Sequence, residues 1–411
     1  MVPRSKFWTW AAGLLIIAVL IEFGLWFRGS PASAPPSTAS KNVPAKLRTL
    51  VTSPAPLGPQ SLPDNFRKVE ICGFGKVALD PTDPTAASSY IGARTEKAAQ
   101  NWLSALLNND DYRARAAGLF LEGKIGVPQI LPMTDQARDS LVQLAVGTAD
   151  PAVYATALYA CSAKFGGSAA GSCGQISVDG WARLDPDNAV PWLLLAGKAR
   201  DRHDDAVEAE AFGRAAKASM SDAYLYSMYT FAEPEMPSDL TPTQRSYLAV
   251  EVIGLEAATT NGEFSVASKH CSAEAMGDSN VRQQCSSLAE LWVTRGTTLL
   301  DFGMGTSIGA RAGWPARRVT DLRMELDALT QAIVETGPAS EGDTWSCDTV
   351  QRGNAYVSRM ARMGEIRAAR DALERSGRTV PELAQKQADT MEKIRRDAEQ
   401  RQSAAPADTS P

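Results

Sequence analysis

The feature that most constrains this chain is a run of apolar residues close to its start. Residues 7–27 read FWTWAAGLLIIAVLIEFGLWF, 21 residues with a single charge at Glu22. As a helix this run is about 32 Å long, which matches the roughly 30 Å hydrocarbon core of a bilayer. Tryptophans stand near both ends, where amphipathic rings prefer the headgroup level. The run predicts one transmembrane helix within an N-terminal membrane anchor, residues 1–28.

The basic residues beside the run predict its orientation. Arg4, Lys6 and the amino terminus precede it, whereas Arg28 alone follows closely. Because positive charge is retained on the cytoplasmic side, we expect a single-pass protein of the inner (cytoplasmic) membrane, with its C-terminal domain periplasmic or extracellular. A cleaved signal peptide is the alternative, with Ser30 and Ala32 at the small-residue positions of a cleavage site. The length of the apolar run favours the retained anchor.

A proline-rich segment follows the predicted anchor. Residues 29–63 contain eight prolines among Ser, Ala and Thr, a composition that leaves little to pack and favours an extended spacer. We therefore expect a tether over 29–63, a helical repeat domain over 64–402 and a disordered tail over 403–411.

The charge distribution argues against a nucleic-acid partner. The net charge of the whole chain is -5, although its first 48 residues carry six Lys or Arg against one acid, so the remainder is more acidic still. Nonspecific binding to nucleic acid needs clustered cations that displace phosphate counterions. With 44% apolar residues, the chain has enough apolar surface for a sizeable core.

The stretch ARLDPDNAVPWLLLAGKARD, residues 182–201, combines turn, cap and helix signals. Asp185 to Ala189 supplies turn and cap residues, and Pro191 suits a first helical turn. The residues that then recur at helical spacing are Trp192, Leu195, Ala196 and Ala199. After RDRHDD, a second helix presents a face of small residues and Phe212, so we expect two antiparallel helices.

This pair resembles a tetratricopeptide repeat, which has an aromatic residue early in its first helix and an acidic turn before its second. The positions in step with that pattern are Trp192, Leu195, Ala196, Asp204, Phe212 and Ala215. The pair departs from it at His203, where glycine is usual, and has no closing proline. Residues 356–377 are a second partial match, with Gly364 and Glu365 as the turn.

Two further stretches, from Asn109 and from Ala149, each place an acidic turn before an Ala-rich helix and are more similar to HEAT-type repeats. The resemblance implies an all-α fold, a degenerate array of helix hairpins in a tetratricopeptide- or HEAT-like α-solenoid. A non-repetitive helical domain is the alternative. Other helices are predicted over 94–108, 244–259, 281–302, 319–335 and 381–402, and a short extended segment over 68–80.

Six cysteines in a chain with an export signal suggest an oxidising compartment, although they allow 15 complete pairings. Cys161 and Cys173 bracket one short connection, and Cys271 and Cys285 bracket another. Each pair is a candidate staple between neighbouring helices, which leaves Cys72 and Cys347 to join the two ends of the body. Buried free thiols are the alternative.

Motifs of known chemistry are weak, and we assign no catalytic, cofactor-binding or metal-binding residue. GTSIG, residues 305–309, places Ser307 as in a hydrolase nucleophile elbow, but both histidines, His203 and His270, precede it. Glycines here favour a loop or helix end that lets another backbone come close. The HDD sequence that begins at His203 fits a turn between helices, and GFGK, residues 73–76, fits a turn better than a phosphate loop.

Stacked helix pairs form extended concave surfaces, which usually bind peptides or proteins. We therefore expect a protein-binding or scaffold module of the cell envelope, with a protein or peptide partner on the concave repeat surface. The alternative is an envelope hydrolase that acts on cell-wall glycan through a pair of carboxylates, which only the fold can bring together.

Overall fold

The structure is a computed structural model that describes residues 67–80, 82–83, 85–126, 133–162, 171–258, 262–336 and 345–404. The predicted anchor (1–28), the predicted tether (29–63) and all but the first two residues of the predicted tail lie outside these residues. Within the described ranges, no helix combines the length and the apolar character that a bilayer crossing requires.

A small hairpin opens the described chain. Strands β1 (Arg67–Ile71) and β2 (Gly75–Leu79) form a two-stranded sheet. Gly73 and Gly75 in its turn adopt φ values of 80° and 73°, a left-handed region that glycine enters without a steric cost. The hairpin confirms the extended segment predicted over 68–80. Gly73 and Phe74 of GFGK lie in its turn, and Gly75 and Lys76 begin β2.

The rest of the described chain is largely helical. Its helices are α2 (Ala86–Leu107), α3 (Tyr112–Leu121), α4 (Asp135–Thr148), α5 (Pro151–Ala160), α6 (Val178–Leu184), α7 (Ala189–Asp201), α8 (Asp205–Ala215), α9 (Ser227–Ala232), α10 (Pro242–Ala257), α11 (Gly262–His270), α12 (Ser279–Arg295), α13 (Leu299–Arg311), α14 (Ala316–Thr336), α15 (Cys347–Met363), α16 (Glu365–Ser376) and α17 (Val380–Ala404). Short 3₁₀ turns occur at Gly171–Gln175, Glu233–Glu235 and Ala275–Gly277.

Local sequence explains many helix starts. Asn188 caps α7, Asp150 caps α5 and Asp204 caps α8, each by accepting hydrogen bonds from backbone N–H groups of the first turn. The single helix predicted over 281–302 is wrong, because α12 ends at Arg295 and α13 starts anew at Leu299. Gly296 is the C-cap of α12, and Thr298 caps α13 in a capping box with Asp301.

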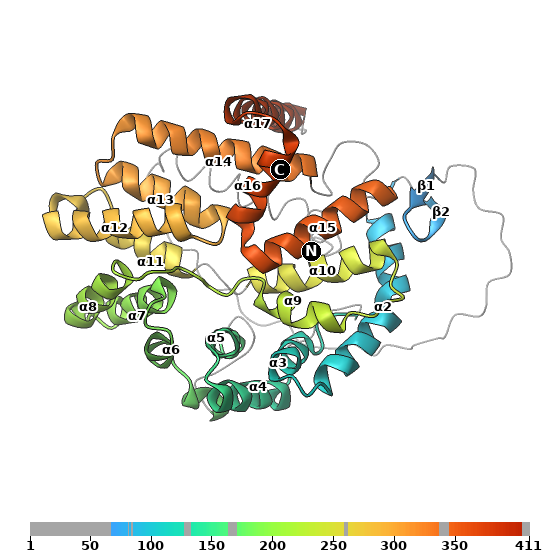
Figure 1. Cartoon of the computed structure of the whole chain (residues 1–411), viewed down its shortest axis with the longest axis horizontal. Coiled ribbons are helices and arrows are strands. Elements are labelled where there is room, and N and C mark those ends of the chain that lie inside the picture. The colour runs from blue at the N-terminus through green and yellow to red at the C-terminus, as the bar shows by residue number, and fades with distance from the viewer. Residues whose placement is uncertain are drawn as a thin grey trace, which may run out of the picture. The chain divides into compact units, whose positions relative to one another are not determined.

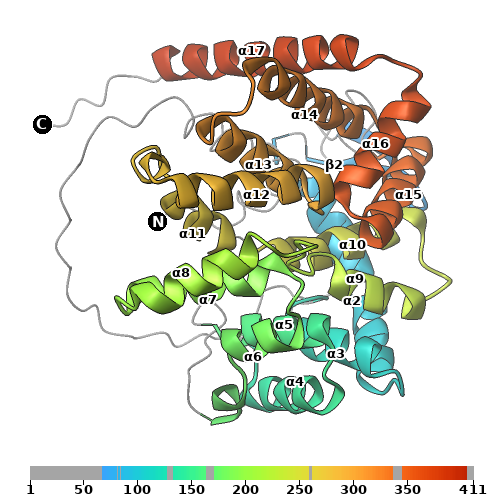
Figure 2. The same cartoon turned by 60° about the vertical axis from the view of Figure 1, so that its left-hand side comes forward.

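Consecutive helices pack as neighbours, as α7 does on α8, α12 on α13 and α15 on α16 (Figures 1 and 2). In an open solenoid each repeat contacts only the next one. Here α9 contacts both α3 and α15, and α10 contacts α15, so the helical array folds back on itself. The architecture is that of many packed helices, and it does not by itself identify a repeat class.

Among the described residues, two clusters of buried hydrophobic side chains form cores of the helical region. One is built largely from α2 to α6, α9 and α10, and it includes the fully buried Trp102 and Trp181. The other is built from α13 to α17 and includes the fully buried Phe302. Tyr226 belongs to the second core, whereas Met228, two residues later, belongs to the first. The chain between α8 and α9 therefore passes from one core to the other.

Three disulfides staple this region: Cys161–Cys173, Cys271–Cys285 and Cys72–Cys347. The first two are the pairs that the spacing favours, the third is the pair that was left over, and the described residues include no free cysteine. Cys72–Cys347 spans 275 residues and ties the residues after the first strand to the start of α15. Three disulfides suggest an oxidising, non-cytoplasmic compartment.

Candidate functional site

Residues 219–226, here called the central segment, connect α8 to α9 and are held by hydrogen bonds along their length. The backbone of Asp222 donates to Asn188 Oδ1 at 3.0 Å, and Met220 O accepts from the Ala189 N–H at 2.9 Å. The indole Nε1 of Trp292 donates to Ser221 Oγ at 2.8 Å. The start of α7 and the last turn of α12 thus both hold this segment.

The central segment contains two residues with strained backbones. Tyr224 and Tyr226 adopt φ values of 57° and 77°, a region that bulky side chains rarely enter. Such a conformation persists only where the surroundings impose it. The Tyr224 hydroxyl donates to Asp185 Oδ2 at 2.8 Å, and the Tyr226 side chain is buried in the second core. Tertiary contacts of both tyrosines therefore oppose the local steric cost.

A buried acid from a neighbouring helix holds the start of α9. Tyr226 provides no side-chain cap to this helix. Glu256, near the end of α10 and only 4% exposed, instead accepts from the Met228 N–H at 2.8 Å and the Tyr229 N–H at 3.4 Å. A carboxylate at a helix N-terminus satisfies orphan donors and interacts favourably with the helix dipole. Glu256 therefore caps α9 from outside.

A reciprocal arrangement joins α13 and α16. Glu365 accepts from the Leu299 N–H at 2.8 Å, while its own backbone N–H donates to Thr297 O at 2.7 Å. Asp301 accepts from the N–H groups of Thr297 and Thr298 at 2.9 and 2.8 Å. The start of α16 thus supplies a hydrogen-bond acceptor to α13, and the residue Thr297 before α13 supplies one to α16. Asp301 and Glu365 both lie at this junction.

We call Asp222, Glu256, Asp301 and Glu365 the central acids. Burial disfavours the charged form and raises the pKa of Glu256 to about 8, although backbone N–H groups oppose the shift. Burial, with the nearby charges of Asp301 and Asp185, raises the pKa of Asp222 to about 7. Burial likewise raises the pKa of Asp301 to about 6, and it raises that of Glu365. With these pKa values, Asp222 and Glu256 gain and lose protons near neutral pH.

Two small cavities flank the central segment, and Ala223 and Leu225 line both of them. Their volumes of about 10 and 20 Å³ provide space for roughly one water molecule each. Tyr159 and Glu256 line the first cavity, and Asp301 lines the second. Among the described residues, the Tyr159 hydroxyl has no hydrogen-bond partner, so the first cavity places a free donor beside a buried acid.

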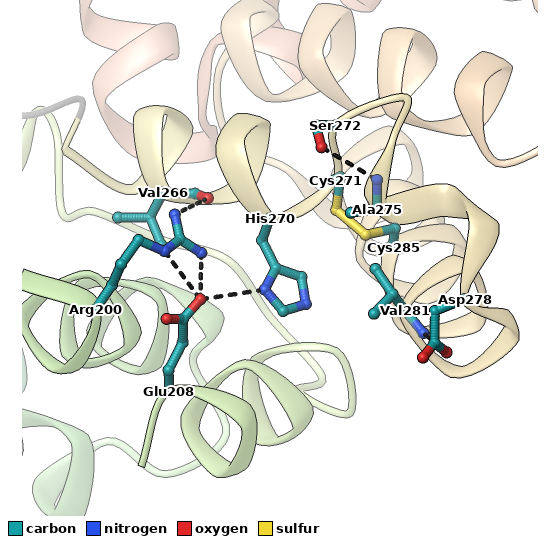
Figure 3. The surroundings of a disulfide bond; sticks show 10 residues. All are labelled: Arg200, Glu208, Val266, His270, Cys271, Ser272, Ala275, Asp278, Val281 and Cys285. Atoms are coloured by element: carbon teal, nitrogen blue, oxygen red, sulfur yellow. Dashed lines mark hydrogen bonds and ion pairs between the residues drawn. A yellow bond between two sulfur atoms is a disulfide. The ribbon is translucent and has the colours of Figure 1, made fainter. Parts of the chain in front are cut away.

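A second polar cluster lies where α7, α8 and α11 meet (Figure 3). Glu208 Oε1 accepts from Arg200 Nε at 2.9 Å and lies 3.5 Å from His270 Nδ1. The His270 ring stacks on Phe212 at 3.6 Å between centroids, and burial lowers the pKa of His270. The cluster joins three helices beside the Cys271–Cys285 disulfide. Because Cys271 is disulfide-bonded, it offers no thiolate that could bind a metal with His270.

The remaining sequence motifs have structural positions. Ser307 lies inside α13, with no strand before it, so the nucleophile-elbow geometry is absent from this helix. A Cβ at Gly305 would lie 2.8 Å from Ala289 O, which confirms the close backbone approach, although the glycine is inside a helix and not in a loop. His203 occupies the turn between α7 and α8 with φ 58°. The described ranges contain no group of three or more His, Cys, Asp or Glu residues that could hold a metal ion.

The central acids were not predicted from the sequence, although two of them carry a signal. Glu256 follows Leu248 and Val252 at helical spacing, so it stands on the apolar face of its helix. Asp301 comes three residues after Thr298, the spacing of a capping box. No comparable signal marks Asp222 or Glu365, whose positions depend on distant segments.

Fold and site together define a largely helical, disulfide-stapled protein. Comparison with protein-family models, with curated proteins and with solved structures found no match to this chain. Its function must therefore be inferred from its own residues.

Proposed function

We propose that the protein is a membrane-anchored, non-cytoplasmic helical-repeat protein that acts as a protein-binding or scaffold module of the cell envelope. The observation that carries the proposal is a body of paired helices stapled by three disulfides. Disulfides favour an export compartment, and helix pairs of fixed geometry present broad side-chain surfaces to partners. The apolar run at residues 7–27 provides the anchor in this proposal.

The repeat class belongs to the proposal as well. Of the tetratricopeptide-like positions in α7 and α8, Trp192, Ala196, Phe212 and Ala215 are buried, and Leu195 is half-buried. The second partial match also forms a helix hairpin, in which α15 and α16 meet at Gly364. We infer that these two hairpins are degenerate tetratricopeptide-like repeats and that the partner lies on the concave surface of the array.

The geometry favours this role over that of an envelope hydrolase acting on cell-wall glycan. A glycosidase needs two carboxyl groups roughly 5 to 9.5 Å apart on either side of a sugar. Glu256, Asp301 and Glu365 instead accept hydrogen bonds from the N-terminal residues of α9 and α13. The cavities beside them have space for about one water each, which is far smaller than a sugar ring.

The topology is tested by adding protease to intact and to permeabilised cells. We expect the helical body to be cleaved once the outer barrier is opened, while cytoplasmic markers stay protected. Protection of the body together with the cytoplasmic markers would contradict the proposed location.

The binding role is tested by photocrosslinking in cells. Among the described residues, two large hydrophobic side chains are exposed: Val146 on α4, at 47%, and Met363 at the end of α15, at 39%. A photoreactive residue at either position should capture a reproducible protein partner, whereas one at the exposed Arg396 of α17 is the control. If the isolated body instead hydrolyses wall glycan, and one acid substitution abolishes this without unfolding, the scaffold proposal is wrong.

A further inference from the structure

The three disulfides differ in how well solvent reaches them. Cys271 and Cys285, whose disulfide is drawn in Figure 3, are both completely buried. Cys173 is 7% exposed and Cys161 is half-buried. Cys347 is the one exposed residue among the six, although its partner Cys72 is buried. A thiol in solution therefore finds its most accessible target at Cys347.

The disulfides also differ in how far the surrounding structure stabilises the thiolates that reduction would release. Cys347 is the first residue of α15, a 17-residue helix capped by Ser346. A helix N-terminus stabilises a thiolate through its unpaired N–H groups and its dipole. Cys271 and Cys161 instead follow the last residues of α11 and α5, where the dipole disfavours negative charge. A disulfide whose reduced form is stabilised is reduced more readily.

The Cys72–Cys347 bond fastens a short segment to the helical body. The Cys72 N–H donates to Trp345 O at 2.9 Å, and Thr243 Oγ1 at the start of α10 donates to Cys72 O at 2.7 Å. A Cβ at Gly73 would lie 2.5 Å from the Thr241 Cβ, so the backbone here is pressed against α10. The Cys72–Cys347 bond and the two hydrogen bonds of the Cys72 backbone thus help to hold residues 70–75 at the starts of α10 and α15.

We propose that the Cys72–Cys347 disulfide is a redox-labile clasp, an exchange site for a dithiol reductant, which holds residues 70–75 on α10 and α15. Opening the clasp loosens this attachment while the other two disulfides stay closed. The inference does not depend on the proposed binding role.

The exchange is a two-electron reduction. One sulfur of the dithiol attacks Sγ of Cys347, forming a mixed disulfide and releasing Cys72 as a thiolate. The second sulfur of the dithiol then attacks the first, closing a disulfide in the reductant and releasing Cys347 as a thiolate. The dithiol is oxidised, the protein disulfide is reduced, and the two protons of the dithiol end on Cys72 and Cys347. The N-terminus of α15 stabilises the second leaving group.

The order of reduction is measured on the folded full-length chain in detergent. The chain is equilibrated in graded ratios of reduced to oxidised dithiothreitol, the free thiols are alkylated, and the peptides are quantified by mass spectrometry. We expect half-reduction of Cys72–Cys347 at a ratio at least tenfold lower than for Cys161–Cys173 or Cys271–Cys285. Reduction of either other pair first, or of all three together, would overturn the proposal.

Two variants separate the clasp from general unfolding. Thr243→Val removes the hydroxyl that donates to Cys72 O, so Cys72–Cys347 should be reduced at a ratio several-fold lower, whereas Thr243→Ser should restore the wild-type ratio. Selective reduction should also speed tryptic cleavage after Lys76 several-fold, while circular dichroism keeps the helical signal. A Cys161→Ser, Cys173→Ser variant is the control and should leave that cleavage rate unchanged. An unchanged cleavage rate after selective reduction would contradict a clasp.

Discussion

The central segment and the layer of α14 and α17 use acidic side chains in opposite ways. At the central segment, Glu256 and Asp301 are buried and accept hydrogen bonds from backbone N–H groups, and burial raises the pKa of each. Between α14 and α17, Glu335 is partly exposed and accepts from Lys386 Nζ at 2.7 Å. Partial burial opposes ionisation of Glu335, but the hydrogen bond and charge of Lys386 lower its pKa.

The difference shows that the surroundings of an acid, and not its residue type, decide its contribution. A carboxyl withdrawn from water is costly to ionise, even where backbone donors face it. A carboxyl at the surface keeps its hydration, and its ion pair adds little to stability. The central segment should therefore be sensitive to substitution and to pH, whereas the α14–α17 surface should tolerate both.

The largest effect is expected from Trp292, which is fully buried and donates to Ser221 Oγ. Trp292→Ala should lower the free energy of unfolding by about 3–5 kcal/mol, because it leaves a cavity beside the central segment. Urea titration followed by circular dichroism measures the loss. Trp292→Phe, which keeps most of the volume, isolates the hydrogen bond and should cost about 1 kcal/mol. A loss under about 1 kcal/mol for Trp292→Ala would show that the central segment does not depend on this contact.

The next largest effect is expected from the Cys271–Cys285 disulfide, which closes a separation of 14 residues. Replacing both cysteines by serine should lower the free energy of unfolding by about 3 kcal/mol, because the unfolded chain gains freedom. Thermal unfolding without reductant checks this. The matched pair Cys161→Ser, Cys173→Ser has a similar separation of 12 and should cost a similar amount. No change in either variant would mean that these bonds are not formed in the cell.

The pH dependence should be intermediate in size. The pKa values of Glu256 and Asp222 are raised to about 8 and about 7, so the folded state binds protons that the unfolded state has released. Their stabilising protonation is complete below the unfolded pKa and is lost as pH rises through the folded pKa. These two groups alone should therefore lower stability by about 2 kcal/mol from pH 6.5 to pH 8.

Glu251, whose pKa burial raises to about 7, adds to this fall in the same interval. Two further groups act mainly outside it. The lowered pKa of His270 changes the free energy of unfolding mainly below about pH 6.5. The pKa of Lys124, which burial lowers to about 8, changes it mainly above about pH 8. Urea titrations at four pH values measure the slope, and Glu256→Gln should flatten it. Stability that stays level or rises from pH 6.5 to pH 8 would refute the assignment.

The smallest effect is expected at the α14–α17 surface. Lys386 lies 2.7 Å from Glu335 Oε1 and is 49% exposed. Lys386→Gln should lower the free energy of unfolding by about 0.2–1 kcal/mol, and the loss should shrink at high salt. Urea titration at low and high salt measures both. A loss as large as that of Trp292→Ala would erase the contrast between the two regions.

Some helices and breaks were predicted from the sequence, and others were not. The helix pair α7 and α8 was predicted from the cap and turn residues around Asn188 and Asp204, and the structure confirms it. The predicted break at Gly364 is confirmed as well. The break at Gly296 was missed, since α12 and α13 together keep a helical period, and the close contact of Gly296 with Trp292 O appears only in the fold.

By itself, the sequence determined that the described body is helical, where most helices start and which cysteines are near enough to pair. These properties depend on caps, spacing and turns within a few residues, and such signals act locally. Only the tertiary structure decided that the array folds back on itself, that Cys72 reaches Cys347 and that the central acids gather. Burial and long-range contacts depend on segments that are far apart in the sequence, so local patterns do not predict them.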